Sequence, residues 1–447
     1  MARRTYFGVH SSPARLLIVL FAAILVAGSV LLMLPVASQD PGATGFTTAL
    51  FTATSALTVT GLVVVDTPTH WTGFGQVVIL VLIQLGGLGI ITLGSLAGLV
   101  VSRHIGLRGR RVAQIESGGL DLGDVRRVIT GVLMIAATVE VVLFVGLSAT
   151  FWLRHGEPFW RAVELGGFHA ISAFNNAGFA LFSDSLAEFV TDPFVNVLVA
   201  VAVLAGAVGF PILNDLRHMP RRPRRWSLHT KLTLTVTGAV LLAGSLIILA
   251  FEWTNPATLG ALDAPGKILA SGFNSTMRTA GFSTIEFGAT NETTQLATII
   301  SMFIGGGSVS AAGGIKVTTL ALLVLAVWAE YRGDEDVGAF GRRVPSGAIR
   351  QAIAVTITVA LAQMVGTMLL LTTGPYALTE ALFEATSAVG IVGLSTGITP
   401  TLDTEGRLII TVLMILGRLG PLTVGTALVL RERNRLYRYP EERPFVG

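Results

Sequence analysis

The sequence contains no cysteine, which excludes a disulfide framework, thiolate metal sites and cysteine nucleophiles. It is also poor in charge, because Asp, Glu, Lys and Arg make up only 13% of the 447 residues, against roughly 25% in soluble domains. Its seven histidines show no spacing typical of metal ligands. We see no paired carboxylates and no nucleophile beside a base, so we expect neither an enzyme nor a bound cofactor. Hydrophobic residues, at 52%, indicate a polytopic membrane protein.

The basic residues gather in five segments that alternate with pairs of apolar segments. These segments are 1–15, 102–128, 214–229, 329–349 and 431–447. Short Lys- and Arg-rich loops between spans face the cytoplasm, so we expect both termini on the cytoplasmic side of the cell membrane. The net charge of +4 then follows from the basic cytoplasmic loops of a protein embedded in membrane lipid, and we expect no nucleic-acid partner. The first apolar run has no small-residue cleavage site after it and is interpreted as a retained helix.

One short pattern occurs four times: a serine, any five residues, a glycine, and then Leu or Phe. The copies run from Ser55 to Gly61, Ser172 to Gly178, Ser275 to Gly281 and Ser387 to Gly393. They lie too far apart for a solenoid of short repeats, so the chain is interpreted as four diverged units of one plan. A ring of four equivalent loops is what a potassium selectivity filter requires, because backbone carbonyls must replace the hydration shell of the ion.

Each unit is predicted to contain a spanning helix, a shorter apolar segment that ends in the repeated pattern, and a second spanning helix. The repeats are 16–101, 129–213, 230–328 and 350–430, with first helices near 16–36, 129–153, 230–252 and 350–373 and second helices near 75–101, 193–213, 295–328 and 406–430. The shorter segments lie near 43–57, 161–175, 264–277 and 378–389, and hold too few residues to cross a bilayer. The predicted fold is an all-α polytopic membrane protein, with eight transmembrane helices and four re-entrant pore helices around a central pore.

The residues that end in the four glycines form the candidate K⁺ filter. Helices that stop at a pore aim the negative ends of their dipoles at its centre, where a dehydrated cation gains from them. Glycine then allows backbone conformations that a Cβ would forbid. The candidate filter residues are Thr58, Val59, Thr60, Gly61, Asn175, Asn176, Ala177, Gly178, Thr279, Ala280, Gly281, Ile391, Val392 and Gly393. A single membrane glycine is more often a packing residue, but four copies at one offset favour a pore.

Three side chains in these segments are interpreted as scaffold. Asn175 and Asn176 are expected to form hydrogen bonds behind the filter rather than line it. Arg278 would repel cations if it faced the axis. We therefore expect it to point away and to pair with a carboxylate, for which Glu384 is one candidate.

The second helix of the third unit is predicted to be broken at the run 305–314, which is rich in glycine and serine. A continuous helix over 295–328 would be about 50 Å long, which exceeds the roughly 30 Å hydrocarbon core. Broken helices at membrane depth mark transport pathways, so we interpret this run as a gate below the filter. The candidate gate residues are Gly305, Gly306, Gly307, Ser308, Ser310, Gly313, Gly314, Lys316 and Arg418. A kink or a small-residue packing face remains an alternative.

Charges inside predicted spans are expensive and are usually functional. For Arg418 we favour a positive barrier that faces the gate. Glu140, in the first helix of the second unit, has no identifiable partner, so a structural ion pair and a functional role remain equal alternatives. A phosphate-binding loop at 313–317 is rejected, because the adjacent Gly-Lys-Ser/Thr is missing.

These motifs resemble the Trk/Ktr/HKT superfamily of potassium transporters, and most closely its Ktr-type membrane subunits. The resemblance covers nearly the whole chain and rests on 58–62 (TVTGL), 174–179 (FNNAGF), 278–282 (RTAGF), 392–397 (VGLSTG) and the glycine-rich run before Lys316. It implies K⁺ uptake, with the four glycines in the filter, 305–314 as an intramembrane gating loop and Arg418 near it. A serine replaces the first filter glycine in sodium-favouring plant members, so Gly61 points to K⁺.

The resemblance also implies partners. It suggests a homodimer in which each protomer has its own pore, docked on a cytoplasmic KtrA-like ring that binds ATP or ADP. It leaves open whether Na⁺ stimulates transport. A secondary transporter coupled to H⁺ or Na⁺ is the alternative function, with the glycine run as an unwound substrate site.

Overall fold

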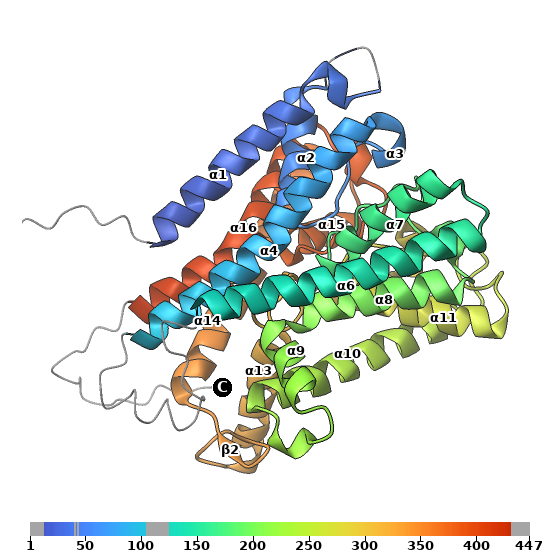
Figure 1. Cartoon of the computed structure of the whole chain (residues 1–447). Coiled ribbons are helices and arrows are strands. Elements are labelled where there is room, and N and C mark those ends of the chain that lie inside the picture. The colour runs from blue at the N-terminus through green and yellow to red at the C-terminus, as the bar shows by residue number, and fades with distance from the viewer. Residues whose placement is uncertain (1–12, 40–41, 43, 104–124, 431–447) are drawn as a thin grey trace, which may run out of the picture.

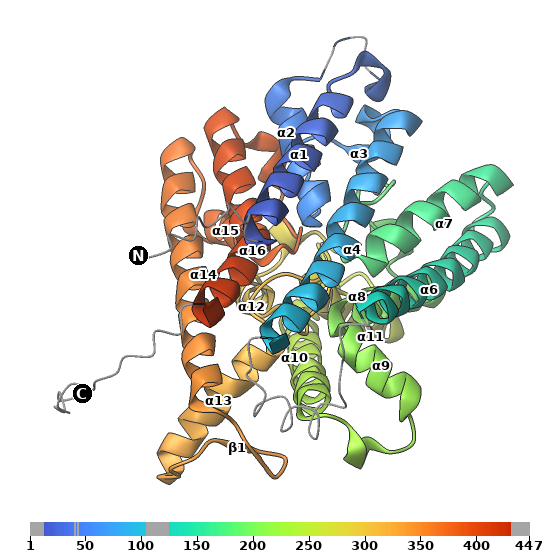
Figure 2. The same ribbon diagram turned by 60° about the vertical axis from the view of Figure 1, so that its left-hand side comes forward.

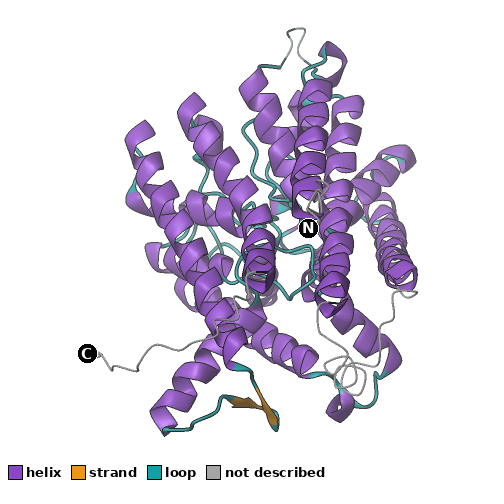
Figure 3. Ribbon diagram, turned by 90° about the vertical axis from the view of Figure 1, so that its left-hand side faces the viewer, coloured by secondary structure: helices purple, strands orange, loops and turns teal. Residues whose placement is uncertain are grey.

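The computed structural model describes residues 13–39, 42, 44–103 and 125–430 (Figure 1). Helices dominate this part of the chain, as an all-α fold requires (Figure 3). The predicted C-terminal segment 431–447 and most of the predicted segments 1–15 and 102–128 lie outside the described residues.

The helices repeat one order four times: a long helix, a shorter helix, a candidate filter segment (58–61, 175–178, 279–281 or 391–393), and then a further helix or helix pair. The first unit contains α1 (Pro13–Leu32), α2 (Phe46–Thr58), the short α3 (Thr67–His70) and α4 (Gly73–Arg103). The second contains α6 (Val125–Leu153), α7 (Phe159–Phe174), α8 (Pro193–Val208) and α9 (Phe210–His218). The third contains α10 (Leu228–Glu252), α11 (Ala264–Thr276), α12 (Glu292–Phe303) and α13 (Val317–Arg332). The fourth contains α14 (Ser346–Thr373), α15 (Leu378–Gly390) and α16 (Thr404–Leu430).

The four units close into a ring. The first contacts the second through α4 against α6 and α7, and the second contacts the third through α8 against α11. The third meets the fourth through α12 against α15 and α13 against α14, and α16 returns to α2 of the first unit. Figure 2 shows the same order by colour, with the blue, green, yellow and red parts of the chain around a common centre. The four short helices therefore converge on the middle of the ring.

Residues near the centre of this ring are buried, whereas many side chains on its outside are exposed. The residues 51–58 at the end of α2 and 383–390 at the end of α15 are all buried, although several carry hydroxyl groups. The long helices instead expose large apolar side chains, such as Val142, Leu242 and Met368. A polar centre with an apolar exterior is typical of a protein whose outer surface meets lipid rather than water.

Three helical stretches of the described chain are long and apolar enough to cross a membrane: Thr130–Leu153, Leu228–Glu252 and Ser346–Thr373. The prediction of one continuous helix over 193–213 is wrong, because α8 and α9 meet at an angle of 103°. The bend occurs at Gly209, whose φ of 98° is rarely open to other residues. A Cβ there would lie 2.6 Å from the Ser308 carbonyl oxygen, so the bend makes room for the interruption in the third unit.

The predicted break in the third unit is present and spans 304–316, between α12 and α13. The two ends of this loop lie side by side, because Ile304 and Ile315 form a parallel bridge. The Gly305 N–H donates to the Ile315 carbonyl at 2.7 Å, and the Val317 N–H donates to the Gly306 carbonyl at 3.0 Å. Beyond α13, a small hairpin of β1 (Gly338–Ala339) and β2 (Arg342–Arg343) adds two strands that the all-α prediction lacks.

Candidate ion pathway

The four pattern glycines all have positive φ angles, and all lie near the centre of the ring. Their φ angles are 94° at Gly61, 73° at Gly178, 64° at Gly281 and 95° at Gly393, all in the region that favours glycine. Each lies directly after a short helix that points into the centre of the ring. The structure thus brings together four positions that are more than a hundred residues apart along the chain.

Each glycine touches the backbone of the next unit so closely that no side chain fits. A Cβ added at any of the four would meet a carbonyl oxygen of the residue directly before the next glycine. The four contacts are Gly61 to Ala177 (2.1 Å), Gly178 to Ala280 (2.4 Å), Gly281 to Val392 (2.7 Å) and Gly393 to Thr60 (2.1 Å). Such distances are below any normal contact of a Cβ, so the ring closes only with glycine at each position. The result is a cycle of backbone groups.

The serine that opens each pattern explains its spacing in two units. The N–H of Gly61 donates to the Ser55 hydroxyl at 3.0 Å, and the N–H of Gly393 donates to Ser387 at 3.0 Å. These bonds tie the filter segment to the helix before it and fix the six-residue offset. The other two serines serve elsewhere: Ser172 donates to the Phe179 carbonyl at 2.8 Å and Ser275 to the Leu241 carbonyl at 2.8 Å. The sequence pattern therefore occurs in all four units, but this hydrogen bond forms in only the first and the fourth.

The third unit differs from the others in backbone shape. Two residues before the glycine, Val59, Asn176 and Ile391 adopt left-handed φ angles of 63°, 59° and 55°. In the third unit, a 3₁₀ turn over Met277–Thr279 takes this place. A left-handed β-branched residue costs about 1–3 kcal/mol, so the surrounding structure must hold Val59 and Ile391 in place.

Asn175 and Asn176 both engage neighbouring segments. The Asn175 amide donates to Gln84 Oε1 at 2.7 Å and to Glu140 Oε1 at 3.3 Å. Asn176 donates to the Thr279 hydroxyl of the third filter segment at 3.1 Å. Glu140, interpreted from sequence as lacking a partner, accepts two hydrogen bonds from Gln84 Nε2, each 3.0 Å long. Sequence reasoning missed Gln84, whose one signal is an amide within a long apolar run.

Arg278 binds backbone carbonyls, so the prediction that it pairs with a carboxylate is wrong. Its guanidinium donates to the carbonyls of Ser301, Ile304 and Gly305 at the end of α12. Glu384, the candidate partner, instead accepts from the Thr396 N–H at 3.3 Å and from two nearby hydroxyls. Sequence alone could not reveal this, because the acceptors are backbone groups of a helix end.

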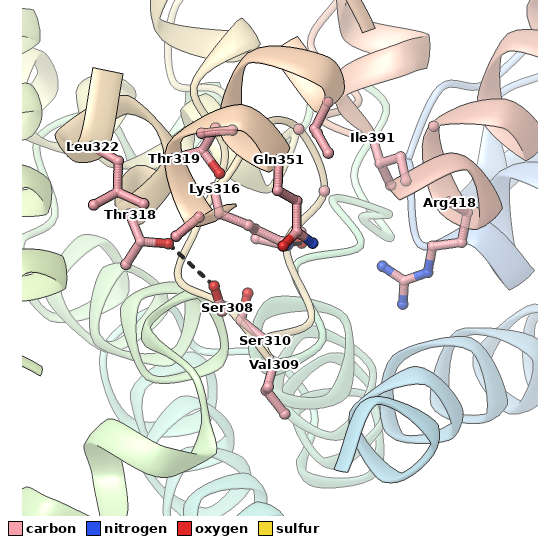
Figure 4. A pocket seen from close by; sticks show the side chains of 17 residues that line it. Ser308, Val309, Ser310, Lys316, Thr318, Thr319, Leu322, Gln351, Ile391 and Arg418 are labelled. Carbon is pink, nitrogen blue, oxygen red and sulfur yellow. Dashed lines mark hydrogen bonds between the residues drawn. The ribbon is translucent and has the colours of Figure 1, made fainter. Parts of the chain in front are cut away.

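A cavity of about 390 Å³ lies between the loop 304–316, α14 and α16. Figure 4 shows Lys316, Ser308 and Ser310 of the loop on one side of it and Arg418 of α16 on the other, with Ile391 of the fourth filter segment also at its wall. Gly313 and Gly314 line it as well. The cavity therefore joins the fourth filter segment to the loop.

Both cations at this cavity bind the loop through carbonyl groups. Lys316 Nζ donates to the Ala312 carbonyl at 2.6 Å, within the loop itself. One terminal nitrogen of Arg418 donates to the Ala311 carbonyl at 2.6 Å, and the other donates to the Gly86 carbonyl in α4 at 2.7 Å. Arg418 is only 5% exposed, so these bonds form in a protected place where they are strong. Arg418 thus holds the loop against the first unit.

The remaining candidate gate glycines pack against backbone. A Cβ would lie 1.6 Å from the Gly313 carbonyl oxygen at Gly305, 2.5 Å from that of Ala207 at Gly306, and 2.2 Å from that of Val208 at Gly307. The Gly307 N–H also donates to the Ala207 carbonyl at 2.8 Å. Gly306 and Gly307 therefore seat the loop on α8, beside the bend at Gly209, and Gly305 brings the two ends of the loop together.

The sequence matches the family described as TrkH, cation transport protein, over residues 12–438. It is 39% identical to the Ktr system potassium uptake protein B of Bacillus subtilis, with 98% of each chain covered. It is 36% identical to the Ktr system potassium uptake protein B of Vibrio alginolyticus, over 97% of this chain and 94% of that protein. The crystal structure of the potassium transporter TrkH from Vibrio parahaemolyticus has the same fold, with a TM-score of 0.73, 20% identity, and 96% of this chain and 87% of that chain covered.

The ring of four short helices closed by glycine contacts, together with this family match, defines a membrane transport protein rather than an enzyme. The chain belongs to the TrkH family of cation transport proteins.

Proposed function

We propose that this chain is the membrane subunit of a Ktr-type K⁺ uptake system and that K⁺ crosses the ring of filter segments. The observation that carries the proposal is the closed cycle of four glycines, each with a positive φ and each against a carbonyl group of the next unit. The identity of 39% over nearly the whole chain to a protein named for potassium uptake supports the choice of ion.

The chemistry of this ring suits a dehydrated monovalent cation. The candidate filter residues, 58–61, 175–178, 279–281 and 391–393, follow helices whose C-terminal ends carry partial negative charge. Ions held by carbonyl groups need no carboxylate, and a site without formal charge releases its ion readily. Transport would follow the electrochemical gradient of K⁺ without covalent chemistry.

The loop 304–316 is proposed to be the gate. It lies beside the fourth filter segment, where a Cβ on Gly313 would lie 2.4 Å from the Gly390 carbonyl oxygen. The hydrogen bonds of Lys316 and Arg418 hold it there. These positive charges would also raise the energy of a cation below the filter while the loop is in place.

In the membrane, we propose eight spans with α2, α7, α11 and α15 as re-entrant helices. These four hold 13, 16, 13 and 13 residues, fewer than the roughly 20 needed to cross. The two termini and the basic segments would face the cytoplasm of the cell. We further propose a homodimer on a cytoplasmic ring of KtrA-like subunits, which would bind ATP or ADP on behalf of the complex.

Flux into vesicles that contain the purified chain tests the proposed function. Uptake of ⁸⁶Rb⁺, a K⁺ analogue, is expected to exceed uptake of ²²Na⁺ and to increase or decrease when the nucleotide-loaded regulatory ring is added. Vesicles without protein serve as the control. Equal and ring-independent fluxes of the two ions would overturn the assignment as a regulated K⁺ subunit.

Glu140 allows a test of the alternative, a transporter coupled to H⁺ or Na⁺. Its carboxylate lies behind the second filter segment and is already bound to Gln84 and Asn175. We expect Glu140→Gln to keep ⁸⁶Rb⁺ uptake within about twofold, because a structural network loses only part of one hydrogen bond. The measurement is uptake with and without an imposed proton gradient. Loss of gradient-driven uptake in the variant, with a fixed stoichiometry in the unchanged protein, would favour coupled transport instead.

A further inference from the structure

Three of the four pore helices end against a glycine of the helix that follows in the same unit. In each case the contact is made by the carbonyl four residues before the filter glycine. A Cβ on the packing glycine would lie 1.9 Å from the Leu57 oxygen at Gly86, 1.8 Å from the Phe174 oxygen at Gly206, and 2.2 Å from the Val389 oxygen at Gly417. These close contacts anchor the filter of each unit to a continuous stretch of helix.

The third unit has no continuous helix at this place, because α12 ends at Phe303. A helix end leaves carbonyl groups without partners inside the helix, and a buried carbonyl without a donor is costly. Arg278, next to Met277 at the corresponding point of the third unit, supplies that donor. One terminal nitrogen of its guanidinium donates to Ile304, to Gly305 at 3.2 Å and to Ser301 at 3.4 Å. The side chain is 3% exposed, and a cation at a helix C-terminus also opposes the helix dipole.

We propose that Arg278 is a positioning residue that couples the third filter segment to the loop 304–316. The inference rests on the proposed function, in which this loop is the gate. Two of its acceptors, Ile304 and Gly305, are the residues that pair with Ile315 and close the base of the loop. A movement of the loop base therefore pulls on Arg278, and a movement of the third filter segment pulls on the loop.

The residues that follow Arg278 contact two other filter segments closely. Thr279, the next residue, receives a hydrogen bond from Asn176 of the second filter segment at 3.1 Å. Gly281 lies against the Val392 carbonyl of the fourth segment. Arg278 is thus attached to two neighbouring filter segments on one side and to the gate on the other. None of the candidate filter residues carries a charged side chain, so in the third unit this link depends on the neighbouring Arg278.

The absence of cysteine permits a direct test, because a single Ser308→Cys substitution reports on the loop without background. We measure the rate at which a water-soluble thiol reagent modifies Cys introduced at 308 in the detergent-solubilised protein. Arg278→Met is expected to raise this rate about tenfold, the effect of losing roughly one hydrogen bond to a charged group. Arg278→Lys is expected to lie between, since all three bonds come from one nitrogen that an ammonium can partly replace.

Arg407→Met is the matched control. Arg407 also donates to a backbone carbonyl, that of Leu402 at 2.9 Å, but it lies in the first turn of α16, 11 residues before Arg418. We expect no change in the modification rate. In a second arm, ⁸⁶Rb⁺ flux is compared in the full chain and in a chain that lacks 306–313. Arg278→Met should raise flux in the first and add less than about twofold in the second, since coupled sites are not additive.

An unchanged modification rate in both Arg278 variants, with the proteins monodisperse, would sink the coupling role. A fall in Rb⁺ over Na⁺ preference without any change at position 308 would show that Arg278 supports the filter alone, and would also overturn it. If Arg278→Met does not fold, the rate in Arg278→Lys decides. The modification assay requires no transport, so a failure of the proposed function, seen as absent flux in the unchanged chain, is distinguishable from a failure of this inference.

Discussion

Replacing Gly61 by serine is expected to lower the preference for K⁺ over Na⁺ about tenfold, which corresponds to ~1.4 kcal/mol between the two ions. A Cβ at this position lies 2.1 Å from the Ala177 carbonyl oxygen, and the φ of 94° is strained for any L side chain. The ring must therefore widen between the first and second units. A wider or looser ring of carbonyls replaces the hydration shell of K⁺ less well. The measurement is the ratio of ⁸⁶Rb⁺ to ²²Na⁺ uptake in vesicles.

The four ring positions should not respond equally to the same substitution. The contact distance is 2.1 Å at Gly61 and Gly393, 2.4 Å at Gly178 and 2.7 Å at Gly281. The φ of Gly281, 64°, is also close to the left-handed region that other residues can reach. We therefore expect serine to lower selectivity most at positions 61 and 393, less at 178 and least at 281.

Gly397→Ser is the matched control for this series. Gly397 has a φ of 99°, as strained as that of Gly61, but a Cβ there meets nothing within 4 Å. Serine at 397 thus adds the same backbone strain outside the ring, and selectivity should stay unchanged. If all four ring variants kept the selectivity of the unchanged protein, the ring would not be the filter.

The sequence predicted the repeated plan well, and the reason is local. The four short helices α2, α7, α11 and α15 begin and end close to the predicted bounds. Each is an apolar segment too short to cross a bilayer, and a glycine shortly after it marks where the helix has ended. The break before Lys316 was equally visible, since glycine and serine cannot continue a helix strongly. Residues close together in the sequence determine these features.

What the sequence did not predict depends on contacts between distant segments. The bend at Gly209 exists because the loop 304–316 occupies the space beside it, and nothing within 193–213 records that neighbour. The acceptors of Arg278 are main-chain carbonyls, which carry no residue identity to search for. Gln84, the partner of Glu140, lies 56 positions away in another unit. The roles of the filter and gate residues themselves remain predictions that transport measurements must decide.

Deleting residues 306–313 is expected to raise K⁺ flux about tenfold in the absence of the regulatory ring. The deletion removes the Ala311 and Ala312 carbonyls that Arg418 and Lys316 hold, and the Gly307 N–H that is bonded to Ala207. It also removes Gly313, which packs under the fourth filter segment against Gly390. Each lost hydrogen bond that holds the loop in place is worth about 1 kcal/mol, so the blocked arrangement should no longer dominate.

The residues on either side of this deletion lie close together. A Cβ on Gly305 would lie 3.0 Å from the Cα atom of Gly314, and Ile304 already pairs with Ile315. The new 305–314 peptide therefore joins two residues that are already in contact, although the chain must reverse there because Ile304 and Ile315 run parallel. We expect α12 and α13 to keep their places, so that the flux change reports on the loop alone.

Arg418→Gln provides a milder comparison for the deletion. It leaves the loop intact but removes the guanidinium that links the Ala311 carbonyl to the Gly86 carbonyl of α4. Its flux should lie between those of the unchanged protein and the deletion, because one of several ties is lost. A deletion protein that is monodisperse yet carries less ⁸⁶Rb⁺ than the unchanged chain would refute the gate. In that case the loop would be part of the conducting path, and the hydrogen bonds of Arg418 would serve to keep it open.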